Sequence, residues 1–433
     1  MAKTRYSLAM PKNIFGAAVA TEATPASTAL PSSRRLLWLL GPALVAGVAY
    51  LDPGNVAANM SAGAQYGYLL VWVVVSGNVM AWLVQYLSAK LGVVTGKSLP
   101  EALRDRFGTR AGRIAYWLQA EAVAMATDIA EVIGGAVALY LLFDLPLLLG
   151  GLITGVISMG LLLVQTHKGP WVFERIVIAL LLVIAVGFCA GVVIAPPEAS
   201  SVVGGLVPRF ADANSVLLAA SILGATIMPH AIYAHSSLAR DRFGRAPSQL
   251  GIPRLLRATR WDVSVAMLIA GSVNVAMLLL AAVNLAGVEG TDSLEGAHAA
   301  LETALGPVIA TLFAVGLLAS GLASTAVGAY AGAEIMEGLL HRRISIVARR
   351  LITLTPALII LAAGVDPTFA LILSQVALSF GIPFALLPLV NLTARRSVMG
   401  HYANKWFTTA AGILVSALLI ALNVVLIVLT VQG

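Results

Sequence analysis

A carboxylate and two helix-breaking residues stand together inside an apolar segment that is long enough to cross a membrane. They read Asp52-Pro53-Gly54-Asn55, within the apolar run 36–64. An ionisable group at membrane depth is energetically expensive and typically marks a binding site or a pathway. Non-helical backbone at that depth is tolerated only where it faces protein or a water-filled cavity. A broken helix around a buried acid therefore predicts a cation site.

A second interruption lies in a later apolar run, 215–239. It reads Gly224-Ala225-Thr226-Ile227-Met228-Pro229-His230. Proline lacks the N–H that would bond the carbonyl four residues earlier. Pro53 therefore frees the carbonyl of Ala49, and Pro229 frees that of Ala225. Two interrupted helices thus offer backbone oxygens as possible ligands.

The side chains at the two breaks add further ligands to these carbonyls. Asp52 supplies a carboxylate, Asn55 an amide oxygen and Met228 a thioether. Oxygen ligands alone suit Mg²⁺ and Ca²⁺, whereas a thioether is soft and favours more polarisable ions. The set predicts a site for Mn²⁺, Fe²⁺ or a similar ion, as transported substrate and not as cofactor. The alternative for Met228 is packing, because methionine commonly fills irregular apolar gaps.

The composition places both breaks in an all-α polytopic membrane protein. Of 433 residues, 59% are hydrophobic and 11% are charged, whereas soluble domains carry about 25% charged residues. Apolar runs of about 20 residues predict eleven transmembrane helices. They are 36–64 and 215–239, both broken, and 68–93, 113–141, 146–166, 172–195, 262–287, 304–338, 346–363, 368–390 and 407–431.

The basic residues of the predicted loops indicate an orientation. Lys and Arg accumulate in cytoplasmic loops, and here they cluster before the first span and in every second connection after it. The opposite connections carry a single basic residue, Arg209, and one of them is acidic. We therefore expect a cytoplasmic N-terminus and an outer C-terminus. The net charge of +7 fits this orientation and contact with anionic lipid, not nucleic-acid binding.

The two breaks lie an odd number of spans apart, so the broken helices cross in opposite senses. This predicts a 5+5 inverted repeat, as in LeuT-like transporters, whose substrate site lies near the membrane midplane. Helices 1–5 fall in 34–195, helices 6–10 in 215–390, and helix 11 in 391–433. Residues 1–33 are expected to form a disordered cytoplasmic tail, with a cleaved presequence as the alternative.

Three carboxylates follow one face of the third predicted span. At about 100° per residue, Glu121, Asp128 and Glu131 lie within roughly 80° of one another. Relays of Asp, Glu and His are a means of passing protons through membrane proteins. The alternative is a set of static salt bridges with Arg349 and Arg350.

Two histidines follow the second break. His230 could take up the proton released when a metal ion reaches Asp52, because the pKa of an imidazole lies near neutrality. His235 is about 140° further around the helix, so the two histidines cannot form an i, i+4 metal pair. A structural role, bonding a neighbouring helix, is the alternative for His230 and the expectation for His235.

Together these motifs resemble those of the natural-resistance-associated macrophage protein (Nramp) family of proton-coupled divalent-metal transporters. The two breaks are similar to the family's metal-binding signatures, and 321–338 is similar to its transport signature. The resemblance covers the chain from about residue 34 to its end. It implies a first set of metal ligands: Asp52, Asn55, Met228 and the carbonyls of Ala49 and Ala225.

The resemblance also implies roles for further residues. Gln375, in the tenth predicted span, matches a position that contributes to the metal site in an occluded state. The alternative is that it bonds a neighbouring helix, as membrane glutamines commonly do. Asp128 and Glu131 would belong to the proton route, with Arg350 as a charge partner. The implied function is proton-coupled uptake of Mn²⁺, Fe²⁺ and similar ions by alternating access, in a bacterial plasma (inner) membrane and without an obligate protein partner.

Other functions fit the residues less well. A Mg²⁺ transporter of the same family is disfavoured by Met228. A Na⁺-coupled amino-acid carrier of the same fold is disfavoured by the acid and the thioether at the breaks. An intramembrane enzyme would need a motif such as Gly-x-Gly-Asp, His-Glu-x-x-His or Gly-x-Ser-x-Gly, and the sequence contains none. We therefore expect a transporter without enzymatic activity or cofactor.

Overall fold

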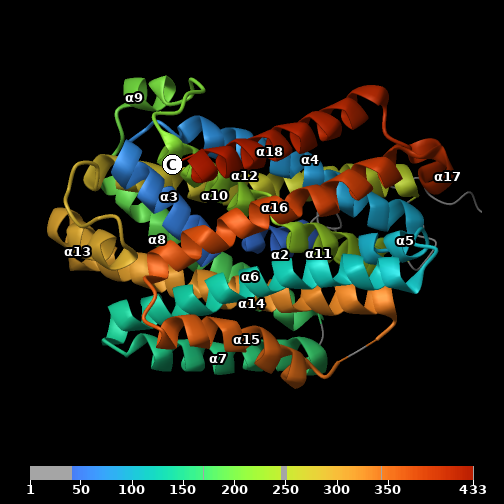
Figure 1. Ribbon diagram of the computed structural model, residues 1–433, viewed down its shortest axis with the longest axis horizontal. Helices are drawn as coiled ribbons and strands as arrows, with labels where there is room; N and C mark the ends of the chain where they lie inside the picture. Colours follow the sequence, from blue (N-terminus) through green and yellow to red (C-terminus); the bar gives the residue numbers. More distant parts are fainter. Residues whose placement is uncertain (1–40, 169, 245–250, 343, 433) are drawn as a thin grey trace, which may run out of the picture.

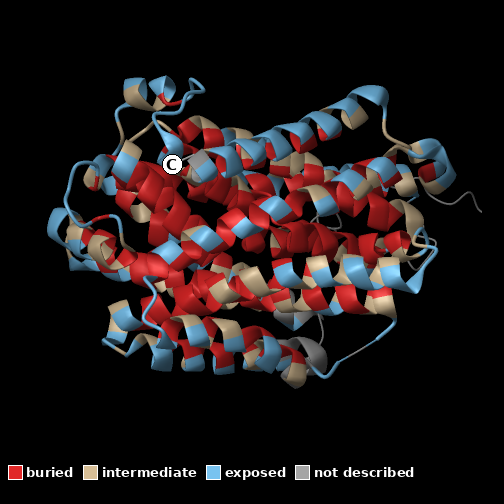
Figure 2. Ribbon diagram, viewed as in Figure 1, coloured by how far each residue is buried: buried red, intermediate tan, exposed pale blue. Residues whose placement is uncertain are grey.

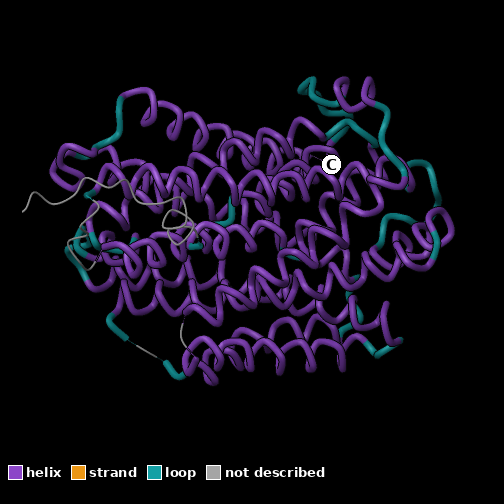
Figure 3. Tube along the Cα trace, turned by 180° about the vertical axis from the view of Figure 1, so that it is seen from behind, coloured by secondary structure: helices purple, strands orange, loops and turns teal. Residues whose placement is uncertain are grey.

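The computed structural model describes residues 41–168, 170–244, 251–342 and 344–432. Long helices lie side by side in a bundle, and most loops gather at its two ends (Figure 1; Figure 3). The described residues contain helices, turns and loops but no strand. The all-α class predicted from composition is therefore confirmed, whereas the predicted tail, 1–33, lies outside the described residues.

The long helices follow the predicted spans closely. They are α4 (Val71–Thr95), α6 (Arg110–Phe143), α7 (Leu147–Lys168), α8 (Pro170–Ile194), α12 (Ile252–Asn284), α14 (Pro307–Leu340), α15 (Ile346–Ala362), α16 (Pro367–Ala394) and α18 (Trp406–Gln432). By length and composition, eight helical segments of the described chain could cross a membrane, and shorter apolar helices accompany them. The total of eleven spans stays a prediction.

The start of α12 differs from the prediction, which placed it at residue 262. The helix begins at Ile252, because Arg254 and Arg257 are good helix formers although their charge excludes them from an apolar run. Hydropathy therefore marked the apolar part of this helix and missed its charged first turns.

The first predicted span is broken at the expected residues. It comprises α2 (Pro42–Val48), the 3-10 turn η1 (Ala49–Leu51) and α3 (Pro53–Tyr66). Between them Asp52 is extended, with φ −75° and ψ 167°. Its Oδ1 accepts the backbone N–H of Asn55 at 2.7 Å, which makes it the N-cap of α3. Pro53 fits directly after it, since the first helical position needs no N–H donor.

The second break has the same construction. It separates α10 (Ala213–Thr226) from α11 (Pro229–Ala239). Ile227 leaves the helical conformation, Met228 is the extended N-cap of α11, and Pro229 begins the helix. A single turn of π-helix, η2 (Arg240–Gly244), follows α11. Each predicted half thus opens with a broken helix, while the division into inverted repeats stays a prediction.

The four half-helices are enclosed by the long ones. α3 packs on α10 and α12, α10 on α16, and α11 on α4 and α14, while α14 also packs on α6 and α8. Figure 2 shows buried residues concentrated along the middle of the bundle. Both breaks therefore lie where the protein is shielded from solvent and from lipid.

Short helices that the sequence did not predict occupy several connections. They are α5 (Leu99–Arg104), α9 (Ala199–Gly204), α13 (Leu294–Leu305) and α17 (Arg396–Met399). The arginine-bearing α5 and α17 lie at one end of the bundle, and α9 and α13 lie at the other (Figure 1). This arrangement agrees with the predicted alternation of basic connections.

Gly63 allows α3 to approach α12 closely. A Cβ at this position would overlap the carbonyl oxygen of Leu278 and would lie 2.9 Å from the backbone nitrogen of Ala282. Gly63→Val should lower the free energy of unfolding by about 1–3 kcal/mol, the usual cost of overpacking. Thermal unfolding of the purified protein in detergent measures the effect.

The matched control is Gly160→Val in α7, where an added Cβ would meet no atom within 4 Å. Both substitutions place the same β-branched residue in a helix, so helix propensity cancels between them. Equal unfolding temperatures for the two variants would contradict the close approach at Gly63.

Candidate metal site

The two breaks meet at one buried site. Asn55, in the first turn of α3, donates through Nδ2 to Asp52 Oδ1 at 3.0 Å and to the carbonyl of Ala225 at 3.1 Å. All three residues are 0% exposed. The carbonyl of Ala225, which Pro229 leaves without its helical donor, is thus engaged by a side chain from the other break. The structure brings these three predicted ligands into direct contact.

Gln375 reaches the same carboxylate from α16. Its Nε2 donates to Asp52 Oδ2 at 3.0 Å, and the residue is 0% exposed. A Cβ at Gly54 would collide with the Gln375 side chain. The glycine in the first break therefore gives room for the glutamine against the first turn of α3.

The two remaining predicted ligands border this cluster along the chain. Met228 is fully buried at the N-cap of α11, and Ala49 is fully buried at the start of η1. The carbonyls of the two residues after Ala49 accept hydrogen bonds from Asn274 of α12, at 2.9 Å, and from Ser320 of α14. The turn that carries Ala49 is thus fixed to two surrounding helices.

Two amide oxygens at the site accept no hydrogen bond from any residue that the structure describes. They are Asn55 Oδ1 and Gln375 Oε1, and both are buried. Leaving a buried polar atom unpaired costs roughly 1–3 kcal/mol, so such atoms call for an explanation. An amide that rotates by 180° exchanges its N–H donors for its oxygen. Rotation would therefore turn either amide from a donor to Asp52 into a ligand beside it.

The site does not resemble a multi-carboxylate metal cage. Among the residues that the structure describes, no three His, Cys, Asp or Glu side chains are grouped so as to hold a metal ion. The charge at the breaks comes from Asp52 alone, and its hydrogen-bond partners are neutral amides. The arrangement can bind a cation with one charged ligand and several neutral ones.

The acidic face of α6 lies against helices that carry its arginine partners. Arg350 Nη1 donates to Asp128 Oδ1 at 2.9 Å, and its Nε and Nη2 donate to Ser158 Oγ at 3.0 and 2.8 Å. Arg349 Nη2 donates to Glu121 Oε1 at 2.8 Å. Both salt bridges considered as the static alternative are therefore present in the structure.

Glu131 differs from the other two acids of this face. Its Oε1 accepts the hydroxyl of Ser324 at 2.9 Å, and it forms no ion pair with any arginine or lysine that the structure describes. The residue is 0% exposed. Glu131 is thus the acid of the α6 face that lacks a cationic partner.

His230 lies between the second break and this acidic face. Its Nδ1 is 3.1 Å from Thr127 Oγ1 of α6, and its Nε2 is buried with no hydrogen-bond partner in the described part of the chain. Thr127 directly precedes Asp128, so the imidazole connects α11 to the helix that carries the acids. Thr127 was not among the residues predicted from sequence, although a polar residue beside Asp128 in an apolar helix is a usable signal.

Other buried polar contacts fix the half-helices at their arginine-rich end. His235 Nδ1 lies 2.6 Å from Gln85 Oε1 of α4, in keeping with the structural role expected for this histidine. Asp262 of α12 accepts the backbone N–H groups of Gly41 at 3.1 Å and Ala43 at 3.0 Å. It therefore holds the start of α2, a contact that sequence alone did not indicate.

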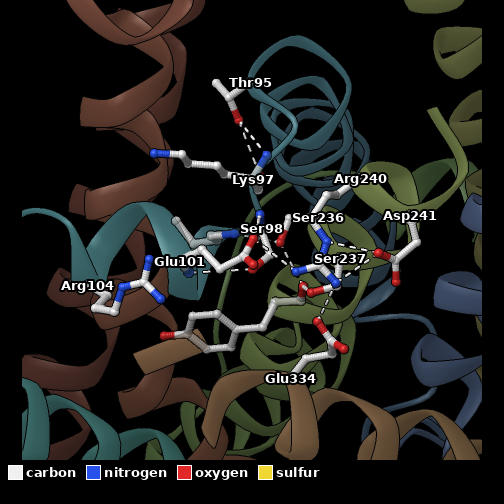
Figure 4. A network of polar contacts seen from close by, with 12 residues as sticks. Thr95, Lys97, Ser98, Glu101, Arg104, Ser236, Ser237, Arg240, Asp241 and Glu334 are labelled. Atoms are coloured by element: carbon white, nitrogen blue, oxygen red, sulfur yellow. Dashed lines mark hydrogen bonds and ion pairs between the residues drawn. The ribbon is translucent and has the colours of Figure 1, made fainter. Parts of the chain in front are cut away.

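A charged cluster closes the same end of α11 (Figure 4). Arg240 reaches Glu101 of α5 at 2.9 Å, Asp241 of η2 at 2.9 Å and Glu334 of α14 at 2.8 Å. Burial raises the pKa of Glu101, but the backbone N–H of Ser98 and the Arg240 guanidinium outweigh it and hold the pKa below its usual value. One arginine thus ties together three separate elements, a contact that sequence alone did not indicate.

Comparison with known proteins gives concordant matches. Residues 43–429 match the family model described as natural resistance-associated macrophage protein-like. The chain is 60% identical over 396 residues to the divalent metal cation transporter MntH of Mycobacterium tuberculosis, covering 92% of each protein. The crystal structure of a manganese transporter from Eremococcus coleocola superposes with a TM-score of 0.82 at 32% identity, covering 92% of this chain and 87% of that one.

A more distant likeness concerns the fold alone. The nucleobase-cation-symport-1 family transporter Mhp1 matches with a TM-score of 0.58 at 16% identity, over 91% of this chain and 92% of that chain. The LeuT-like architecture expected from the two breaks is therefore confirmed.

The Asp128–Arg350 pair predicts a large effect on stability. Arg350→Ala leaves the Asp128 carboxylate buried without its cation, which should cost about 3–5 kcal/mol. Adding Asp128→Asn should recover part of the loss, because an amide needs no counter-charge. Thermal unfolding of the purified variants measures both effects, with exposed Arg396→Ala as the control. A double variant no more stable than Arg350→Ala would contradict this account of the pair.

Proposed function

The chain belongs to the natural resistance-associated macrophage protein-like (Nramp) family, and from this premise we propose that it carries divalent transition-metal ions through the membrane together with protons. The ions are Mn²⁺, Fe²⁺ and their like, moved by alternating access in a bacterial plasma membrane with the N-terminus in the cytoplasm. The main support is the buried carboxylate of Asp52 at a helix break, beside two unpaired amide oxygens. The names of the relatives, a divalent metal cation transporter and a manganese transporter, agree with it.

Metal binding would use the atoms that now hydrogen-bond to one another. The Asn55 amide lies between the Asp52 carboxylate and the Ala225 carbonyl and donates to both. A divalent cation would take the place of the Asn55 N–H donor between these two oxygens. The amide would rotate so that its own oxygen faces the ion. Gln375 would turn in the same way. In the low dielectric of the buried site, attraction to the carboxylate offsets part of the cost of removing the ion's water.

The ligand types support a transition metal as the cargo. Mg²⁺ dehydrates reluctantly and prefers an oxygen-only octahedral shell, whereas the thioether of Met228 suits softer ions. A site with a single carboxylate, Asp52, also binds a divalent cation less tightly than a site with several carboxylates. Transport requires an ion to leave as well as to enter, so moderate binding is an advantage.

The proton route would begin at the same carboxylate. Arrival of a metal ion at Asp52 makes a proton there unfavourable, and His230 is the neighbouring titratable group on the path to α6. Thr127 is within hydrogen-bond distance of His230 and adjoins Asp128. Glu131, which forms no ion pair with a described arginine, is the next acid on that face. In the proposed cycle the proton passes along these side chains while the metal stays at the breaks.

Alternating access would use the non-helical residues of the two breaks as hinges. A rotation of α11 against α14 and α5 would separate Arg240 from Glu334 and Glu101, because Arg240 directly follows α11 while Glu334 lies on α14 and Glu101 on α5. The charged cluster of Figure 4 is therefore the contact that opens and re-forms at the predicted cytoplasmic end. Exchange of ion pairs at domain contacts is a common means of switching between two states.

The central test is metal uptake into proteoliposomes that contain a pH dye. With an acidic exterior, wild-type protein should admit Mn²⁺ and acidify the interior. Asp52→Asn should reduce both signals to below about a tenth. Losing the charged ligand should cost more binding free energy than the roughly 1.4 kcal/mol that corresponds to a tenfold change in affinity. Asp144→Asn, an exposed acid at the end of α6, is the matched control. Mn²⁺ uptake without acidification would contradict proton coupling. Uptake of Mg²⁺ but not of Mn²⁺ would show that Mg²⁺ is the transported ion.

A second test concerns ion selectivity. Met228→Ala should weaken discrimination against Ca²⁺ and Mg²⁺ by roughly tenfold and reduce Mn²⁺ uptake less, since the oxygen ligands remain. Competition of Ca²⁺ with Mn²⁺ uptake measures the ratio. Met277→Ala, another fully buried methionine, should leave the ratio unchanged. Equal losses for all ions in Met228→Ala would assign this side chain to packing.

A further inference from the structure

The helix that carries Gln375, α16, contains two prolines in its interior, Pro383 and Pro388. Proline lacks the N–H that would bond the carbonyl four residues earlier. Pro383 therefore leaves the carbonyl of Ser379 without its helical donor, one turn after Gln375. A backbone group at membrane depth needs a partner from within the protein, so this turn of α16 depends on a neighbouring helix.

A side chain of α18 supplies the missing donor. Asn423 Nδ2 donates to the Ser379 carbonyl at 3.0 Å, and the Ser379 hydroxyl lies 2.7 Å from Asn423 Oδ1, to which it can donate. Asn423 is 5% exposed in a helix that is otherwise mostly apolar. A buried amide is costly unless it is paired. The carbonyl that Pro383 frees therefore explains the buried asparagine of α18.

α10 packs against the same turn of α16. A Cβ at Gly224 would overlap the carbonyl oxygen of Gln375 and would lie 3.0 Å from the backbone nitrogen of Ser379. Gly224 belongs to the motif of the second break, so the turn 375–379 adjoins that break directly. The turn is thus held by α10 and by α18, and a shift of it would move the Gln375 amide relative to Asp52.

The second proline of α16 has an equivalent arrangement. Pro388 leaves the carbonyl of Phe384 without its helical donor, and Tyr116 Oη of α6 donates to that carbonyl at 2.6 Å. Phe384 lies more than two helical turns beyond Gln375. Both freed carbonyls of α16 are therefore paired by side chains of neighbouring helices, and the first of them adjoins the residue that reaches Asp52.

We propose that Asn423 is a positioning residue for the metal site. By pairing the Ser379 carbonyl it fixes the turn of α16 from which Gln375 reaches Asp52. α18 lies outside both predicted halves of the repeat, and it acts on the ion site through α16. The proposal rests on the proposed function where it concerns metal binding, whereas the link between Asn423 and Gln375 can be tested without metal.

Thermal unfolding of the purified protein without metal measures this link. Asn423→Leu leaves the Ser379 carbonyl unpaired and should lower the unfolding temperature by a few degrees. Gln375→Ala removes the hydrogen bond to Asp52 and should lower it as well. Effects of substitutions that share no contact are usually additive. If Asn423 positions Gln375, the shift caused by Gln375→Ala should instead be clearly smaller in the Asn423→Leu background.

Pro383→Ala provides the rescue. Alanine restores the N–H that bonds the Ser379 carbonyl within the helix, so in this background Asn423→Leu should lower the unfolding temperature less and should no longer diminish the effect of Gln375→Ala. Should Asn423→Leu alone yield no folded protein, recovery of folding by Pro383→Ala decides the same question.

Tyr116→Phe is the matched control, because it removes the donor from the other freed carbonyl of α16. It should lower the unfolding temperature but leave the effect of Gln375→Ala unchanged, since Phe384 is distant from Gln375 along the helix.

Calorimetric titration with Mn²⁺ then tests the metal site itself. Asn423→Leu should raise the dissociation constant of Mn²⁺ several-fold and should add little to the effect of Gln375→Ala, whereas Tyr116→Phe should leave the constant unchanged. Wild-type protein that binds no Mn²⁺ would contradict the proposed function. The metal-free comparison would still decide whether Asn423 positions Gln375.

Three results would overturn the proposal. Additive shifts of the unfolding temperature for Asn423→Leu and Gln375→Ala would assign Asn423 to helix packing alone. Failure of Pro383→Ala to rescue Asn423→Leu would show that the Ser379 carbonyl is not the group on which Asn423 acts. An equal reduction of the Gln375→Ala effect by Tyr116→Phe would mean that any loss in α16 reaches Gln375, without a particular role for Asn423.

Discussion

Backbone that leaves the helical conformation at membrane depth must find all its hydrogen-bond partners within the protein, and this constraint governs the structure around Asp52. Unpaired backbone groups in such surroundings cost several kcal/mol each. The Asp52 carboxylate caps α3, while Asn274 and Ser320 take the carbonyls of the preceding turn. The surrounding helices α12, α14 and α16 thus serve first to satisfy the breaks, and the enclosure that results is what makes a buried ion site possible.

The polar atoms that hold the two breaks together are the same atoms that would bind the metal ion. Asn55 and Gln375 donate to Asp52, yet each has a buried oxygen that accepts no hydrogen bond from a described residue. The hydrogen-bonding capacity of the site is therefore only partly used. A bound cation would be coordinated by these two oxygens once the amides rotate. A similar asymmetry separates the acids of α6, where Asp128 and Glu121 have arginine partners and Glu131 has none among the described residues.

Positive charge gathers at one end of the bundle. The arginines at the start of α6, Arg110 and Arg113, and Arg342 after α14 border a cavity whose remaining wall is apolar. Nearby, Arg240 is surrounded by three acids and joins α5, η2 and α14. Arginines of the same end therefore have different surroundings, since Arg240 lies among three acids and the others line a cavity with an apolar wall.

The sequence by itself determined the class of protein, the position of both breaks and most helix bounds. These follow from local causes, because Pro and Gly act on their own turn of backbone and a membrane requires about 20 apolar residues. It also identified Asp52, Asn55 and the acids of α6, whose residue types are costly in an apolar helix. Only the tertiary structure decided which groups meet. Gln375 contacts Asp52 across 323 positions of sequence, Thr127 faces His230 and Arg240 gathers its acids, because such contacts depend on how distant helices pack, which no local pattern encodes.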